Sequence, residues 1–315
     1  MTQSPVPEET SRTDGQSENE PRSRGASWGS ILVLALILVL AAAITWAGSQ
    51  NGAKVWGLPV FAVSVCWIFL VQLVAFIPAW TNHTEKFFDL TGSLTYISTI
   101  LAALLLSGHF NATAILITFA VVVWATRLGS FLFTRVRRAG SDGRFDDIKK
   151  NLLRFLNVWM IQGLWITITI SAALAAVTAV EQPPFSGLTV AGLLIWAAGF
   201  TFEIIADAQK SRFRAEPANK DQFIHTGLWS WSRHPNYFGE ITLWVGVALM
   251  ALPALHGWQY VTLVSPLFVT ILLTKVSGIP LLERKADSKW GSHKDYREYK
   301  AKTSVLVPLP QSRRI

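Results

Sequence analysis

Long apolar runs are the feature of this 315-residue chain that most restricts its fold. A helix needs about 20 apolar residues to cross the hydrocarbon layer of a bilayer. Runs of about that length lie near residues 29–48, 55–80, 111–134, 153–180, 188–210, 236–254 and 257–278. A shorter run near 93–108 would be either an eighth crossing or a re-entrant segment. The runs predict an all-α, polytopic membrane bundle of about seven or eight transmembrane helices.

The distribution of basic residues predicts how the bundle is oriented. The chain has a formal net charge of +8, and most of its loop arginines and lysines lie in 135–152, in 211–235 and after residue 280. The opposite loops hold only Lys54. By the positive-inside rule the basic loops face the cytosol, which places both termini there if eight helices cross. Because the positive-inside rule already accounts for the net positive charge, we expect no nucleic-acid partner.

Composition divides the chain into three parts. Residues 1–27 are rich in Ser, Glu, Pro and Gly and predict a disordered polar tail. Because this tail precedes the first apolar run, that run is predicted to be a retained helix of a transmembrane domain spanning 28–280. Residues 281–315 form a basic, amphipathic cytosolic segment. It either lies on anionic lipid or closes over a cytosolic cofactor.

A stripe of charged residues continues the sixth run. Glu203, Asp207, Lys210 and Arg214 are spaced by four, three and four residues, so they share one face of a helix. Carboxylates inside a membrane cost several kcal/mol unless they are paired or face a polar cavity. The stripe therefore predicts a hydrated pocket or a bound polar ligand. The alternative is a set of ion pairs within the helix near the interface.

Two arginines mark the cytosolic half of the fourth run. Arg127 lies about two turns before its end, and Arg135 follows two turns later, near the same face. A guanidinium at this depth needs an anion or a carbonyl as its partner, and it binds phosphate through two hydrogen bonds. The alternative is that Arg127 snorkels to the interface or pairs with Glu203 or Asp207.

The stretch WSRHPNYFGE, residues 231–240, begins the seventh run. Pro235 suits the first turn of a helix, whose free amides attract anions, and Arg233 and His234 add positive charge beside it. Asn236, Tyr237 and Glu240 can converge on a polar group between helices. The stretch thus predicts a phosphate site. The alternative, in which these residues only mark the membrane boundary and Asn236 caps the helix, leaves Glu240 unexplained at depth.

Together these segments resemble a known family. RLG in the fourth run, EIIADAQKSRF in the sixth, GLWSWSRHPNYFGE before the seventh and the final LLER are similar to the steroid 5-alpha-reductase-like membrane reductases. The likeness is to the bacterial branch labelled domain of unknown function 1295. It covers most of the chain from about residue 85. The resemblance implies a helical membrane fold whose cytosolic half encloses NADPH and which reduces a carbon–carbon double bond conjugated to a carbonyl in a lipid.

The resemblance also implies roles for individual residues. Cofactor contacts would come from Arg127, Arg135, Asp207, Arg214, Arg233, His234, Asn236, Tyr237 and Glu240. A polar group must polarise the substrate carbonyl and another must supply a proton. The family's steroid-reducing members use a tyrosine where this chain has Trp124, whose indole cannot supply a proton. Asp89, Tyr96 and Glu203 are the substitute donors, and we take Glu203 and Tyr96 as the catalytic candidates. The alternative for Tyr96 is an interfacial aromatic.

Two other functions compete with the reductase. Membrane methyltransferases of the isoprenylcysteine carboxyl methyltransferase type share an RHPxYxG core and use S-adenosylmethionine, but typically show paired glutamates where this chain has Glu283-Arg284. A transporter or scaffold would use the buried charges as an ion path, but the chain lacks internal repeats. No metal site is predicted, and the only cysteine, Cys66, excludes a cysteine-based zinc site. The expected location is the bacterial inner membrane or the endoplasmic reticulum.

Overall fold

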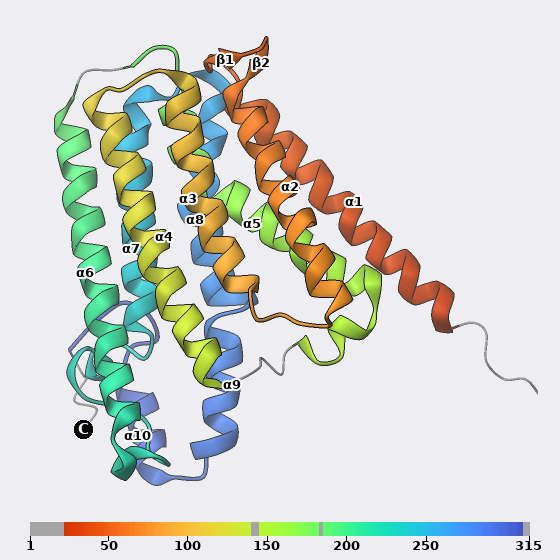
Figure 1. The fold of residues 1–315 in the computed structure, drawn as a ribbon. Coiled ribbons are helices and arrows are strands. Elements are labelled where there is room, and N and C mark those ends of the chain that lie inside the picture. The colour runs from red at the N-terminus through yellow and green to blue at the C-terminus, as the bar shows by residue number, and fades with distance from the viewer. Residues whose placement is uncertain (1–21, 140–144, 183–184, 311–315) are drawn as a thin grey trace, which may run out of the picture.

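The computed structural model of the chain describes residues 22–139, 145–182 and 185–310, and for 22–27 and 135–139 it describes the backbone alone. These residues form an all-α bundle (Figure 1). The described residues include eight helical segments long and apolar enough to cross a membrane. The predicted fold class is therefore confirmed, and the chain is an integral, multi-pass membrane protein by the length and apolarity of its helices.

The first seven spans are single helices. They are α1 (Arg22–Gly48), α2 (Val60–Thr81), α3 (Phe88–Ser107), α4 (Ala112–Ala139), α5 (Leu152–Thr178), α6 (Gly187–Ala215) and α7 (Pro235–Ala251). The eighth is a broken span. It consists of η6 (Gly257–Leu263), α8 (Val264–Ile271), the wider turn η7 (Leu272–Val276) and α9 (Ile279–Trp290), after which α10 (Lys294–Lys302) follows. Short turns connect these helices: η2 (Ile148–Lys150), η3 (Pro217–Asn219), η4 (Gly227–Ser230) and η5 (Leu252–Ala254).

The weak run near 93–108 proves to be a full helix, α3, which begins five residues earlier at Phe88. Its first turns carry Asp89, Thr91 and Ser93, which lower the apolarity of the run without ending the helix. Within the described residues, the helices long and apolar enough to cross a membrane thus number eight rather than seven. At the other end of the chain, α1 begins at Arg22, so the part of the predicted tail before that residue lies outside the described residues.

The basic loops and both described ends of the chain lie at one end of the bundle, which we call the basic end. In Figure 1 the start of α1 and the helices α9 and α10 all lie at the bottom of the bundle. A two-stranded hairpin, β1 (Lys54–Val55) and β2 (Leu58–Pro59), lies at the opposite end. This arrangement agrees with the predicted positive-inside orientation.

The core lies around α5, which runs obliquely through the bundle (Figure 1). Every residue of α5 from Ile166 to Thr178 is buried, and small residues such as Ala172, Ala173 and Ser171 let neighbouring helices approach closely. The helix packs on α1, α2, α3 and α8. It therefore serves as the support against which the helices of the functional site are placed.

Candidate functional site

Glycines bring α6 and α7 into backbone contact. A Cβ atom on Gly199 would lie 2.5 Å from the backbone nitrogen of Leu243, and one on Gly239 would lie 2.6 Å from the backbone nitrogen of Glu203. Gly192 of α6 and Gly246 of α7 make an equally close contact about two helical turns further from the basic end. Small residues at such positions are how membrane helices pack without a hydrophobic driving force. The close contact places Glu203 of α6 directly beside the start of α7.

Arg127 of α4 bridges two carboxyl groups of α6. One terminal nitrogen donates to Glu203 and the other to Asp207, and both carboxyl groups are buried. We call Arg127, Glu203 and Asp207 the inner cluster. The sequence left open whether Arg127 binds a phosphate or pairs with Glu203 or Asp207, and in the structure it pairs with both. Because one guanidinium serves two carboxyl groups, Arg127 is engaged within the protein rather than presented to a phosphate.

An apolar cavity of about 370 Å³, the inner cavity, opens beside the inner cluster. It is formed by α3, α4, α5 and α7 with the segment 145–148. Its lining residues are Phe88, Asp89, Gly92, Ser93, Tyr96, Trp124, Leu128, Leu132, Phe145, Ile148, Val158, Ile161, Gln162, Trp165, Ile166 and Glu240. Such a volume and a mainly apolar lining with few polar groups are typical of small-molecule sites.

Glu240 carries the carboxyl group of α7 to this cavity. It lies near enough to interact electrostatically with Glu203 and Asp207. In the described part of the chain no hydrogen bond is made to the Glu240 side chain. The sequence predicted that Glu240 can converge with Asn236 and Tyr237 on a polar group between helices; the structure places it in the lining of the inner cavity.

Tyr96 and Trp124 lie next to each other in the wall of the inner cavity. Their ring centroids are 5.1 Å apart at an interplanar angle of 86°, and Trp244 of α7 packs on Trp124 at 4.8 Å. Tyr96 is 6% exposed, so the alternative of an interfacial aromatic is wrong. A phenol hydroxyl buried in an apolar cavity is suited to donate a hydrogen bond to a ligand carbonyl.

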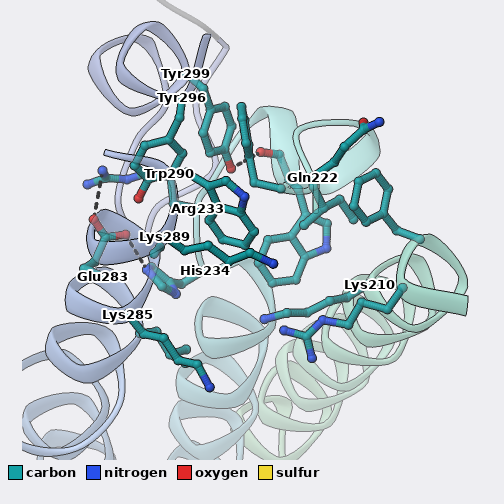
Figure 2. Close-up of a pocket in the computed structure, with 17 residues that line it drawn as sticks. Lys210, Gln222, Arg233, His234, Glu283, Lys285, Lys289, Trp290, Tyr296 and Tyr299 are labelled. Carbon is teal, nitrogen blue, oxygen red and sulfur yellow. Dashed lines mark hydrogen bonds and ion pairs between the residues drawn. The ribbon is translucent and has the colours of Figure 1, made fainter. Parts of the chain in front are cut away.

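A second cavity, of about 180 Å³, lies at the basic end, and we call it the basic cavity. Its lining residues are Lys210, Phe213, Arg214, Gln222, Phe223, Ile224, Trp229, Arg233, His234, Leu282, Glu283, Lys285, Ala286, Lys289, Trp290, Tyr296 and Tyr299. Figure 2 shows Lys210, Lys285 and Lys289 pointing toward the space between the helices, with Trp290 and the two tyrosines around it. The lining contains five lysines and arginines but only one carboxyl group, that of Glu283, and it also contains aromatic rings. The cavity is therefore suited to an anion that carries flat rings.

Glu283 of α9 organises one wall of the basic cavity. Its carboxylate lies 3.0 Å from Arg233 Nη1, 2.9 Å from His234 Nε2 and 3.3 Å from Lys300 Nζ. We call these four residues the outer cluster. Arg233 Nε and His234 Nδ1 are buried and have no hydrogen-bond partner among the described residues. The unused N–H of Arg233 beside a cavity is a recognisable place for a ligand anion.

The electrostatics of the outer cluster follow from this geometry. Burial lowers the pKa of His234 below its ordinary value, although the hydrogen bond to Glu283 opposes the change. Partial burial acts against the charged form of Lys300 as well, but hydrogen bonds to Asp287 and Glu283 prevail and raise its pKa. Lys300 therefore stays charged while His234 favours its neutral form.

The C-terminal segment packs against the loop before α7 and contributes Tyr296 and Tyr299 to the basic cavity. Arg233 N donates to Ser304 O at 2.9 Å, Leu309 N donates to Trp231 O at 3.1 Å, and Ser232 Oγ donates to Leu306 O at 2.8 Å. On the other side, Tyr299 Oη donates to Trp229 O at 2.7 Å. Backbone and side-chain hydrogen bonds thus hold residues 299–309 against the loop that precedes α7.

The predicted cofactor residues fall into separate groups. Arg214, Arg233 and His234 line the basic cavity, whereas Glu240 lines the inner cavity. Tyr237 stacks on His234 with ring centroids 5.7 Å apart. The remaining residues contact neither cavity directly. Arg127 and Asp207 belong to the inner cluster with Glu203, Asn236 is half-buried and lines neither cavity, and the side chain of Arg135 lies outside the described residues.

Sequence reasoning missed Glu283, Lys300, Tyr299 and Trp229 as parts of the site. Glu283 lies 49 positions from His234 in the sequence, so no local spacing joins them. The available signal was the basic, aromatic composition of the segment after 280, which left open both a position on anionic lipid and closure over a cofactor and did not identify Glu283.

Comparisons with known proteins support a family but no named relative. A search of curated proteins found no significant match. A search of solved structures likewise found none. A family model described as a protein of unknown function (DUF1295) matches residues 75–303, which is more than half of the chain and includes both cavities and both clusters. The chain therefore belongs to the DUF1295 family.

Proposed function

We propose that the protein is a membrane reductase of the steroid 5-alpha-reductase-like type, which uses NADPH to reduce a carbon–carbon double bond conjugated to a carbonyl in a lipid. The observation that carries the proposal is the pair of cavities. A basic, aromatic cavity at the predicted cytosolic end stands beside an apolar cavity with a phenol and a carboxyl group. The basic cavity suits a charged dinucleotide, and the apolar cavity suits an apolar substrate.

The residues of the basic cavity fit a dinucleotide phosphate. The buried Nε of Arg233, which has no hydrogen-bond partner among the described residues, would donate to a phosphate oxygen, with Lys210 and Arg214 adding positive charge. Trp290 and Tyr299 also line an adjoining cavity of about 680 Å³, which provides the additional room that a nucleoside needs. Aromatic side chains of this kind stack on a base.

The spacing along α7 suits a cofactor that joins both cavities. His234 lines the basic cavity and Glu240 lines the inner cavity, and six residues of helix correspond to about 9 Å along the axis. When bound, NADPH supplies the hydride. Tyr96 would hold the substrate carbonyl and stabilise the negative charge that develops on its oxygen. Glu240 would face the reacting end, and Glu203 would act through the inner cluster rather than by direct contact with the substrate.

The test is cofactor stabilisation of the detergent-purified protein. Its unfolding temperature is measured with NADPH, NADH and S-adenosylmethionine at several concentrations. We expect NADPH to raise the temperature well above the effect of NADH, and the rise to grow with concentration. Stabilisation by S-adenosylmethionine alone would instead support a methyltransferase of the isoprenylcysteine carboxyl methyltransferase type and would refute the reductase.

A further inference from the structure

An apolar segment follows the charged helix α10. Six of the nine residues of α10 are charged, whereas residues 304–309, SVLVPL, carry no charge. Val305, Val307 and Leu309 are 42%, 50% and 54% exposed, and the residues between them are partly buried. Alternation with a period of two is typical of an extended chain with one covered face. We call residues 304–309 the C-terminal strap, and its three exposed side chains form an apolar row.

Hydrogen bonds hold the C-terminal strap against the loop before α7. Arg233 N donates to Ser304 O at 2.9 Å, and Leu309 N donates to Trp231 O at 3.1 Å. Trp231 is itself 51% exposed and adds an aromatic side chain next to the apolar row. Since Arg233 lines the basic cavity, the strap is tied to the backbone of one of the cavity walls.

The strap lies at the depth where the helices leave the membrane. Pro235, two residues after Arg233, is the first residue of the seventh span. Arg233 pairs with Glu283 at 3.0 Å, and Glu283 begins the charged part of α9 after the apolar residues 279–282. Both neighbours of the strap therefore change from charged to apolar sequence at this level, as is typical of a membrane–water interface.

The loop that holds the strap packs on a lipid-facing part of α6. Ile204 and Ile205 are exposed within the sixth span. Trp229 Nε1, from the same loop, donates to Ala206 O at 3.0 Å. An exposed apolar patch marks contact with a protein or with a membrane. Here both the depth and the neighbouring surface are those of a contact with lipid.

We propose that the C-terminal strap and Trp231 insert their exposed side chains into the leaflet at the basic end, and that the bilayer thereby holds Arg233 in the wall of the basic cavity. The chain returns to the membrane after the charged α10, so lipid covers the outer face of the strap while its backbone holds the loop. Tryptophan and aliphatic side chains at this level are stable in the boundary between headgroups and acyl chains. The inference goes beyond the proposed function, because it stands whichever anion the basic cavity binds.

Quenching by spin-labelled lipid tests the contact. The full chain is placed in phosphatidylcholine nanodiscs after Cys66→Ala, which removes its only cysteine. One protein then carries a bimane fluorophore at Val307→Cys, and a matched control carries it at Lys294→Cys, the exposed first residue of α10. With lipid spin-labelled near the headgroup, we expect emission from position 307 to fall by about half, because its side chain lies in that boundary, and emission from 294 to stay unchanged. Equal quenching at the two positions overturns the contact. So does no quenching at 307, which is the result expected if a partner protein covers the strap instead.

Hydrogen exchange tests the hold on Arg233. Its amide donates to the strap, so it exchanges when the strap opens. In nanodiscs, the combined variant Val305→Ser, Val307→Ser and Leu309→Ser should exchange this amide about tenfold faster than the wild type. The control, Leu58→Ser, removes an exposed leucine from the hairpin at the opposite end and should leave the rate unchanged. An unchanged rate in the combined variant would show that the bilayer does not hold Arg233. Both experiments are made without NADPH, so neither outcome depends on the reductase.

Discussion

The inner and outer clusters both combine basic side chains with carboxyl groups, but carboxyl groups outnumber basic groups in the inner cluster and basic groups outnumber carboxyl groups in the outer one. In the inner cluster one guanidinium serves two buried carboxyl groups, so its donors are used within the protein. In the outer cluster one carboxylate serves Arg233, His234 and Lys300, and nitrogens of the first two lack partners among the described residues. The difference teaches that Arg127, deep in the bundle, supports the structure, whereas Arg233 near the basic end keeps a nitrogen that a ligand can use.

The largest effect is expected from breaking the inner cluster. Arg127→Met leaves the carboxyl groups of Glu203 and Asp207 buried without their partner, which costs about 3–5 kcal/mol of unfolding free energy. Thermal unfolding in detergent measures it. Arg284→Met removes an exposed arginine from α9 and should change stability by less than about 0.5 kcal/mol. A loss at Arg127 no larger than at Arg284 would show that the inner cluster is not structural.

A smaller loss is expected from separating α6, which carries the two carboxyl groups of the inner cluster, from α7. Gly199→Ala adds a Cβ atom 2.5 Å from a backbone nitrogen, and such overpacking costs about 1–3 kcal/mol. The matched control on the same helix is Gly187→Ala, where no atom lies within 4 Å of the new carbon. Both are compared by thermal unfolding. If the two variants unfold at the same temperature, the glycine contact does not set the helix spacing.

Removing a ligand-facing cation should affect binding rather than stability. Arg212 and Arg214 are both exposed residues of α6, but only Arg214 lines the basic cavity. Arg214→Ala should weaken NADPH binding by about tenfold, the value of one charge-assisted hydrogen bond, and leave the unliganded protein folded. Arg212→Ala serves as the control. Equal NADPH affinities of the two variants would show that Arg214 is not part of the phosphate site.

The smallest effect concerns the pH dependence of the outer cluster. Because burial lowers the pKa of His234, the unfolded chain takes up a proton at this residue at a higher pH than the folded protein does. Stability should therefore fall as the pH decreases through the ordinary histidine range. His234→Gln removes this contribution, so its unfolding temperature should fall less between pH 7.5 and 5.5. An identical pH profile for wild type and variant would contradict the account.

The sequence predicted the fold well because apolar length and loop charge are local properties. The spans follow from apolar length, and only the polar first turns of α3 made one of them uncertain. The helix start at Pro235 follows from another local property, the suitability of proline for the first turn of a helix. The site was predicted in part. The spacing of Glu203 and Asp207 showed that they share a face, but their partner on α4 depends on how α4 and α6 pack. Glu283 and Gln162 were missed because their contacts, to His234 and Phe88, join helices far apart in the sequence.

The most direct test is an experimental structure of the protein with NADPH bound. The account predicts the diphosphate within hydrogen-bond distance of Arg233 and Lys210, the nicotinamide beside Glu240, and Arg127 still paired with Glu203 and Asp207. A cofactor bound outside the basic cavity, or one whose phosphates take Arg127 from its carboxyl partners, would contradict the division between a structural inner cluster and a ligand-binding outer cluster.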